Sequence, residues 1–289
     1  MKVSSKKRTL LTVLSVLLIV SLSLALIGCS SPAPAASGSG SATATASANV
    51  LKVGASPAPH AEILASVKDT LAAEGIDLQI IEYSDYVIPN TALQAGDIDA
   101  NYFQHLPYLE DFNKENKTTI ESIGGIHFEP LAVYAGNTKT LADLPEGAKI
   151  AVPNDTTNEA RALQLLAAQG LITLPANADL TITPRDITAN PKNLQFVEVE
   201  AASIPAQLSS VDLAVINGNF ALSANLPASG ILATEDVKSQ AAQTYANIIA
   251  VKAGNETNPN VQALYKALTS AATREFINQT FDGVVVPVF

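Results

Sequence analysis

The chain has 289 residues, and its 17 basic and 27 acidic side chains give a formal net charge of −10 at pH 7. Because no Lys/Arg cluster follows the N-terminal segment, the sequence argues against nucleic-acid binding. A single cysteine excludes both an internal disulfide framework and a thiolate metal site. Residues 50–289 are long enough for one large or two modest domains with their own cores.

The first 28 residues have the layout of a secretory signal. Four cations (Lys2, Lys6, Lys7 and Arg8) precede an uncharged apolar run over residues 10–27. The run leads into the sequence LIGC at 26–29, which resembles a lipobox, the processing signal of bacterial lipoproteins. About eighteen apolar residues could also form a transmembrane helix, but the order of basic flank, small residue and cysteine favours cleavage before Cys29. We expect Cys29 to carry acyl chains such as palmitate and to anchor the protein on the extracytoplasmic face of the cell membrane.

Residues 29–49 comprise this cysteine and a spacer. The spacer is almost wholly Ser, Ala, Gly, Thr and Pro, so it predicts a flexible linker that holds a domain away from a surface. Folding is expected to begin near Val50.

From there the pattern predicts strands and helices in alternation. The expected strands are 51–55, 78–83, one beginning near 100, 128–134, 149–153, 194–199, 211–216 and 245–252. The expected helices are 60–74, 89–95, 105–116, 157–168, 203–208 and 259–273, and 284–288 is an extended tail. This alternation implies parallel sheets covered by helices. Two such blocks suggest two α/β lobes that face each other across a cleft at the carboxyl ends of their strands.

The sharpest local signal is the helix start after the strand at 149–153. Thr156 and Glu159 have the spacing of a capping box, and helix N-terminal amides favour an anion. Arg161 lies just over one turn into this helix and can bind a carboxylate through two hydrogen bonds. The alternative is a surface arginine on a capped helix.

Aromatic residues gather in one part of the chain: eight of the fifteen lie between Tyr83 and Tyr134. Three of the eight residues in 101–108 are aromatic and one is His105, at a strand-to-helix junction. Core packing is the ordinary explanation for such a cluster. Polar-tipped rings interleaved with Phe103 also suit a pocket wall around a small apolar group.

Two asparagines are further candidates. Asn217 ends an apolar strand, where it forms either an ordinary turn or a contact to a polar ligand. Asn247 is an amide inside another apolar strand, so it needs hydrogen-bond partners, either structural or from a ligand.

These segments resemble the NlpA-type lipoproteins, the methionine-binding receptors of ABC importers. The motifs that carry the resemblance are DxDANxFQHxP at 97–107, PNDxTNxxR at 153–161, ITxNP at 187–191 and NGNFA at 217–221. The resemblance implies a two-lobed, type II periplasmic-binding-protein fold whose lobes are joined by two crossing strands. On this basis lobe 1 comprises 50–135 and 245–289, and lobe 2 comprises 136–244. It also implies two partners, a methionine-importing permease and its cytoplasmic ATPase.

Position by position, the resemblance implies a ligand site of seven residues. The implied aromatic cage for the thioether comprises Tyr86, Phe103 and Tyr108, with His105 in the same wall. The implied partner of the ligand carboxylate is Arg161, and the implied contacts to the polar end of the amino acid are Asn217 and Asn247. Tyr86 is assigned by the resemblance alone. The chain departs from its relatives at Thr156, where many have proline, and at Tyr108, where some have phenylalanine. Methionine in the L- or D-form is the expected ligand, and some relatives bind short methionine-containing peptides instead.

Two other classes of function are alternatives to a receptor. An enzyme would need a base matched to a nucleophile or a metal, and the three histidines (His60, His105 and His127) lack metal-ligand spacing such as HxxxH. No GxSxG, Walker or dinucleotide motif occurs, so we expect no catalytic residue, no cofactor and no metal. A receptor for another small amino acid, or a surface adhesion lipoprotein, stays an alternative.

Overall fold

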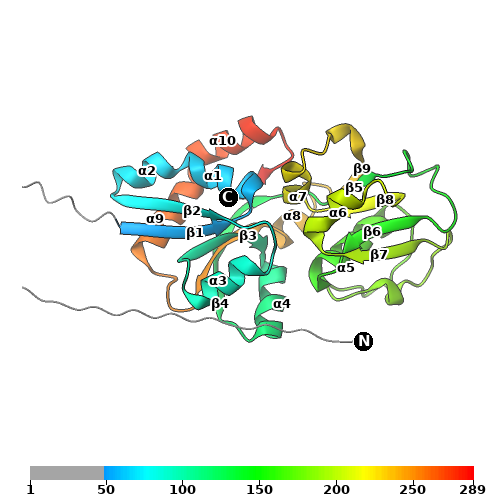
Figure 1. Ribbon diagram of the computed structural model, residues 1–289, viewed down its shortest axis with the longest axis horizontal. Coiled ribbons are helices and arrows are strands. Elements are labelled where there is room, and N and C mark those ends of the chain that lie inside the picture. The colour runs from blue at the N-terminus through cyan, green and yellow to red at the C-terminus, as the bar shows by residue number, and fades with distance from the viewer. Residues whose placement is uncertain (1–48) are drawn as a thin grey trace, which may run out of the picture. The chain divides into compact units, whose positions relative to one another are not determined.

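The computed structural model describes residues 49–289, and Figure 1 shows them as two α/β lobes. The expected signal, Cys29 and the spacer up to residue 48 lie outside the described residues. From residue 49 onward, no helix is both long enough and apolar enough to cross a bilayer.

Lobe 1 is built on a six-stranded mixed sheet of order β11-β4-β10-β3-β1-β2. Its strands are β1 (Asn49–Ala55), β2 (Ile76–Glu82), β3 (Ala100–His105), β4 (Ile120–Phe128), β10 (Asn247–Lys252) and β11 (Val286–Pro287). β1 runs parallel to β2 and β3, whereas β10 runs antiparallel to β3 and β4. The sheet therefore joins two distant stretches of the chain, because β10 enters between β3 and β4.

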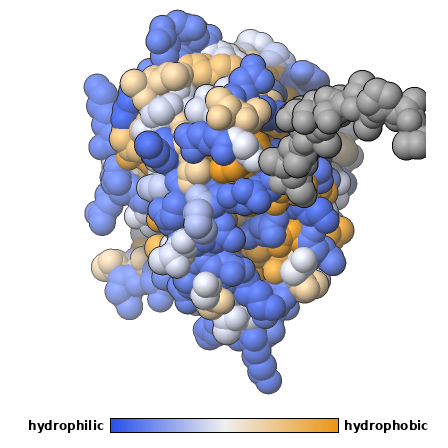
Figure 2. Space-filling view, turned by 90° about the vertical axis from the view of Figure 1, so that its left-hand side faces the viewer, coloured by the Kyte–Doolittle hydropathy of each residue, from blue (hydrophilic) through white to orange (hydrophobic). Residues whose placement is uncertain are grey.

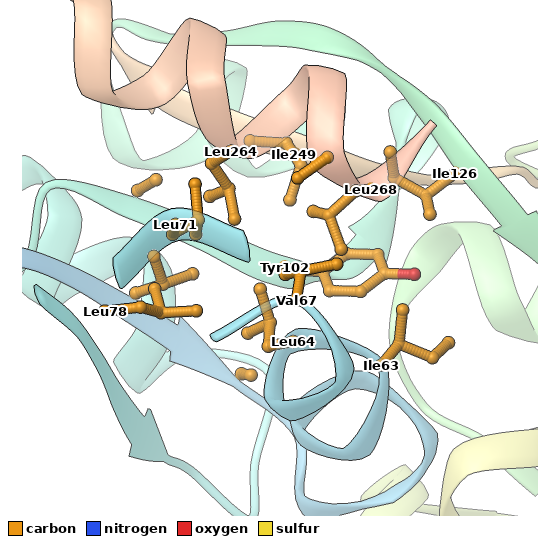
Figure 3. Packing of buried hydrophobic residues seen from close by; sticks show 14 of the residues in the cluster. Ile63, Leu64, Val67, Leu71, Leu78, Tyr102, Ile126, Ile249, Leu264 and Leu268 are labelled. Atoms are coloured by element: carbon orange, nitrogen blue, oxygen red, sulfur yellow. The ribbon is translucent and has the colours of Figure 1, made fainter. Parts of the chain in front are cut away.

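Helices cover both faces of this sheet. One face carries α1 (Glu62–Ser66), α2 (Lys68–Ala73), α9 (Pro259–Leu268) and α10 (Ala271–Phe281), and the other carries α3 (Ile88–Ala95) and α4 (Leu106–Asn116). Figure 3 shows how Leu64 and Leu71 meet Leu264 and Leu268 around Tyr102. These leucines recur at helical spacing, so burying one face of each helix forms the core. The outer end of lobe 1 is mostly hydrophilic, with smaller apolar areas between (Figure 2).

Lobe 2 contains a five-stranded mixed sheet of order β7-β6-β8-β5-β9. Its strands are β5 (Ala132–Ala135), β6 (Lys149–Pro153), β7 (Gln195–Val199), β8 (Leu213–Ile216) and β9 (Ile231–Thr234). α5 (Thr156–Ala168) packs on one face, while α6 (Ile204–Gln207) and α7 (Gly218–Ser223) pack on the other. The remaining elements are α8 (Ala241–Thr244), a π-helical turn at Pro57–Ala61 and 3₁₀ turns at Pro184–Asp186, Ala201–Ser203 and Ala228–Gly230.

The chain crosses between the lobes twice, at 129–131 and at 235–246. The expected strand 128–134 is wrong here, because β4 ends at Phe128 and β5 begins at Ala132. Pro130 lies between them and has no N–H with which to continue a ladder. β5 pairs with β8 and β9, so residues 132–135 belong to the sheet of lobe 2 and not to lobe 1 as expected.

Three further expectations need correction. The predicted helix 60–74 is interrupted at Val67, whose φ of −105° and ψ of 1° leave the helical region. The predicted helix 259–273 ends at Leu268, and a separate helix, α10, starts at Ala271 with Ser270 as its N-cap. The sheets are mixed and not purely parallel, because β5 and β10 run against their neighbours.

Candidate functional site

A narrow pocket between the lobes brings together all seven residues singled out in the sequence. Its lining comprises Tyr86, Phe103, Gln104, His105, Tyr108, Glu129, Asn158, Arg161, Asn217, Gly218, Asn219 and Asn247. Several of these residues sit where a strand ends and a helix begins, at the β3–α4 and β8–α7 junctions. The carboxyl ends of parallel strands are the usual place for a ligand in α/β folds, and the combination of aromatic side chains with a few polar groups is typical of a small-molecule site.

Lobe 1 contributes an aromatic wall. The ring of Tyr86 lies 5.8 Å from that of Phe103 and 5.6 Å from that of Tyr108, measured between centroids. Phe220 of lobe 2 also packs against Tyr86, with the ring centroids 4.7 Å apart. The Tyr108 hydroxyl donates to the Tyr86 carbonyl oxygen at 2.9 Å, so a protein atom already accepts it. The wall therefore offers ring surface to an apolar or thioether group.

His105 links the aromatic wall to lobe 2. It caps α4, where its Nδ1 accepts a hydrogen bond from the Tyr108 backbone N–H. Its Nε2 then carries the proton and donates to Asn158 Oδ1 at 3.3 Å. Burial, assisted by the nearby charge of Arg161, lowers the pKa of His105 to about 3, so the ring is neutral at physiological pH.

Arg161 supplies a buried positive charge, but it has a carboxylate partner that the sequence did not reveal. Its Nε and Nη2 donate to the two carboxylate oxygens of Glu235 at 2.8 and 2.5 Å. Nη2 also donates to the carbonyl oxygen of Glu129 at 2.9 Å, and the guanidinium stacks over Tyr245 at 4.2 Å. Within residues 49–289, Nη1 is the guanidinium nitrogen that makes no hydrogen bond. One donor nitrogen thus remains for an anion.

The helix that carries Arg161 does not begin as predicted. Asp155, not Thr156, is the N-cap of α5, and its Oδ1 accepts from the backbone N–H of Asn158 at 3.0 Å. Glu159 consequently forms no capping box, and its Oε1 is buried without a partner among the described residues. Asp155 caps the helix one position earlier than predicted, because Asp is as good an N-cap as Ser or Thr.

Amides from lobe 2 complete the polar end of the cavity. Asn217 Nδ2 donates to Asn158 Oδ1 at 2.8 Å. In the described part of the chain, the buried atoms Asn217 Oδ1 and Asn219 Nδ2 have no hydrogen-bond partner. Buried polar atoms are nearly always paired, so one free acceptor and one free donor in a cavity wall point to a polar ligand.

Behind the cavity lies a buried group of ionisable residues. Glu129 Oε1 is 2.7 Å from His127 Nε2 and 3.4 Å from His60 Nε2. Tyr102 hydrogen-bonds the other nitrogen of His127, and His60 Nε2 bonds Asn247 Oδ1 at 3.0 Å. Burial raises the pKa of Glu129 and lowers the pKa values of His60 and His127, to about 4 and about 3.

No sequence pattern indicates this group, because its members are far apart in the chain or lie within an apolar run. The ligand atoms of His60, His127 and Glu129 lie within 4.8 Å of one another, a spacing that could also hold a metal ion. Glu129, Asn158 and Asn219 are cavity residues that the sequence reasoning did not assign.

The model of the NlpA lipoprotein family matches residues 51–289. The chain belongs to the NlpA lipoprotein family. It is 39% identical over 241 residues to the methionine-binding lipoprotein MetQ of Bacillus subtilis (strain 168), covering 82% of this chain and 87% of that protein.

Two solved structures show the same fold. A nutrient binding protein from Burkholderia cenocepacia bound to methionine matches with a TM-score of 0.78 and 45% identity, over 83% of this chain and 100% of that one. An ABC transporter periplasmic substrate-binding protein from Coxiella burnetii matches with a TM-score of 0.77 and 39% identity, over 82% and 100%. The expected two-lobed periplasmic-binding-protein fold is confirmed.

Proposed function

We propose that this protein is a lipid-anchored receptor that binds methionine outside the cytoplasm and delivers it to an ABC importer. The observation that carries the proposal is the cavity itself. It has aromatic surface from Tyr86, Phe103 and Tyr108 on one side, and a buried guanidinium with unpaired amide atoms on the other. An amino acid with an unbranched apolar side chain matches that division.

The charges at the polar end support a zwitterion. Within residues 49–289, the hydrogen bonds of Arg161 use Nε and Nη2 and leave Nη1, and Asn219 Nδ2 is buried without a partner, so both donors suit a carboxylate. Asn217 Oδ1 is an acceptor and suits an ammonium group. Asn247 borders the same end and keeps its amide nitrogen for a ligand, because its oxygen accepts from His60. The seven residues predicted from the sequence remain our proposed ligand contacts.

Anchoring and partners follow from family membership and from the N-terminal segment. Cys29 is the proposed site of acylation, which tethers the folded part through the spacer on the extracytoplasmic face. The proposed partners are the permease of a methionine importer and its cytoplasmic ATPase. No catalytic step is proposed, because the relatives named above are binding proteins.

The test is a thermal-shift and calorimetric comparison on protein refolded without ligand. L-methionine should raise the melting temperature in a concentration-dependent way, because it binds only the folded state. D-methionine, norleucine, glutamine and methionine-containing dipeptides are run beside it. Glutamine should bind far more weakly, since burying its amide in the aromatic wall costs about 1–3 kcal/mol. A larger shift with a dipeptide would reassign the ligand, and no shift with any of them would refute the receptor function.

A further inference from the structure

The carboxylate of Glu129 is the only acidic side chain in the cavity wall, within the part of the chain that the structure describes. It is 5% exposed, and its direct neighbours His60 and His127 are neutral at physiological pH because burial lowers their pKa values. The charge of Arg161 is already shared with the Glu235 carboxylate. The charge of Arg161 lowers the pKa of Glu129, but among the described residues no cationic side chain hydrogen-bonds this carboxylate. A buried carboxylate without a bonded cation is unfavourable, and binding a cation would relieve that cost.

The geometry holds this carboxylate in one orientation. His127 Nε2 donates to Oε1, and its Nδ1 is turned to the Tyr102 hydroxyl, which fixes the histidine tautomer. From the other lobe, the backbone N–H of Asn219 lies near enough to the carboxylate to lower its pKa and so to favour its charged form. A carboxylate offers about four lone-pair positions, so these contacts leave acceptor capacity on the side of the cavity.

Gly218 brings lobe 2 close to this group. A Cβ at Gly218 would lie 2.7 Å from Glu129 Oε2 and 2.8 Å from its Cβ, so only glycine allows the approach. The neighbouring Asn217 carries the unpartnered acceptor Oδ1. Two acceptors, one from each side of the cleft, thus border the same end of the cavity.

We propose that Glu129, oriented by His127, binds the ammonium group of the ligand together with Asn217 Oδ1. This inference rests on the proposed function and deepens it: the receptor requires a free primary amine and rejects ligands without one. Arg161 and the Asn219 side-chain amide then serve the carboxylate. His127 is a positioning residue, because it acts through Glu129.

The test compares methionine with 4-(methylsulfanyl)butanoate, the same molecule without its amine. Affinities are measured by calorimetry on ligand-stripped wild type, Glu129→Gln and the matched control Glu121→Gln, an exposed glutamate on β4, the strand that ends one residue before Glu129. Wild type and control should bind methionine at least about 100-fold more tightly than the analogue without the amine. Glu129→Gln should bind methionine at least about 30-fold more weakly than wild type does, and the analogue less than about threefold more weakly, because only methionine loses a charge partner.

Each other outcome is informative. Equal losses for both compounds, or an unchanged preference in Glu129→Gln, would overturn the role of Glu129 while leaving the receptor function intact. Binding of neither compound to wild type would instead refute the proposed function. If Glu129→Gln does not fold, Glu129→Asp is used instead, because it keeps the charge but places it one methylene farther from the ligand. Its preference for methionine over the analogue should be smaller than that of wild type but should not disappear. A rise in melting temperature with Zn²⁺ that His127→Gln abolishes would assign the group to a metal and overturn the inference.

Discussion

The Tyr86 hydroxyl of lobe 1 donates a hydrogen bond to Asn219 Oδ1 of lobe 2 at 2.5 Å, so the aromatic wall is tied directly to the polar end of the cavity. The same ring packs against Phe220 of lobe 2. Tyr86 is therefore both a wall of the cavity and a connection between the lobes.

Tyr86→Phe should weaken methionine binding by about 1–3 kcal/mol, because it keeps the ring but leaves a buried amide oxygen without its donor. The loss should appear mainly as faster dissociation, since the hydrogen bond exists only when the lobes meet. Stopped-flow and calorimetric measurements provide both quantities. Tyr265→Phe, on α9 and away from the cavity, is the matched control. Wild-type dissociation in Tyr86→Phe would show that the hydrogen bond contributes nothing to closure.

Phe103 should set the preference for a thioether over a methylene. Contact between sulfur and an aromatic ring contributes about 0.3–1.5 kcal/mol, so wild type should bind methionine about two- to tenfold more tightly than norleucine. Phe103→Leu retains apolar burial and should bring this ratio close to one. Phe112→Leu changes a buried ring outside the cavity lining and should leave the ratio unchanged. A ratio that survives in Phe103→Leu would contradict a role for this ring in selectivity.

Removing Glu235 should have opposite effects on the free and liganded protein. Glu235→Gln leaves the buried Arg161 without its carboxylate, and breaking such a pair costs about 3–5 kcal/mol. The melting temperature of the free protein should therefore fall. The ligand carboxylate then replaces the missing charge, so methionine should raise the melting temperature of Glu235→Gln by more than it raises that of wild type. Arg161→Ala should abolish most of the rise. A smaller rise in Glu235→Gln would mean that the pair pre-organises the site.

Glu159 should make stability depend on pH. Burial and the neighbouring Glu198 carboxylate raise the pKa of Glu159 from 4.5 to about 7. The folded state therefore holds this proton more tightly than the unfolded state, and the resulting stability is lost as the pH rises from about 4.5 through about 7.

Glu159→Gln removes that dependence. The difference in melting temperature between Glu159→Gln and wild type should increase from pH 5 to pH 8. The increase should be about 2–4 °C for each kcal/mol of unfolding free energy that wild type loses over this range. The exposed substitution Glu110→Gln should keep a constant offset over the same range. A constant offset in Glu159→Gln as well would show that the folded protein does not raise this pKa.

Cys29→Ala should abolish acylation. Cells grown with labelled palmitate should incorporate label into the wild type and into Ser30→Ala, but not into Cys29→Ala. Incorporation into the alanine variant, or processing at residue 28 without the cysteine, would be incompatible with the proposed anchor.

Sequence patterns identify the parts of the site that are local. Phe103, His105 and Tyr108 lie at one strand-to-helix junction, and Arg161 follows a capped helix start, so a short window contains each signal. Glu129 was missed because it interrupts an apolar stretch that resembles a single strand. In the structure that stretch is two strands in different sheets.

Partners distant in the sequence have no such signal. Glu235 is 74 residues from Arg161, and only the fold brings them together. The same holds for His60 and Asn247, which are separated by 187 residues. β4 escaped prediction for another reason: the glycines at 124–125 lower the strand propensity of its centre.

Arg161 is bonded to both segments that cross between the lobes, to the Glu129 carbonyl on the first and to the Glu235 carboxylate on the second. A rotation of the lobes about these crossings would change the distance from the guanidinium to Phe103 and Tyr108. It would leave the hydrogen bonds of Arg161 to the two crossing segments in place. In such a rotation the guanidinium would keep its place while the aromatic wall moved, so the contacts to the charged end of an amino acid and those to its side chain would form in separate steps. Arg161 would then select for the charged end of the ligand before the lobes close, and the aromatic wall would select for its side chain on closure.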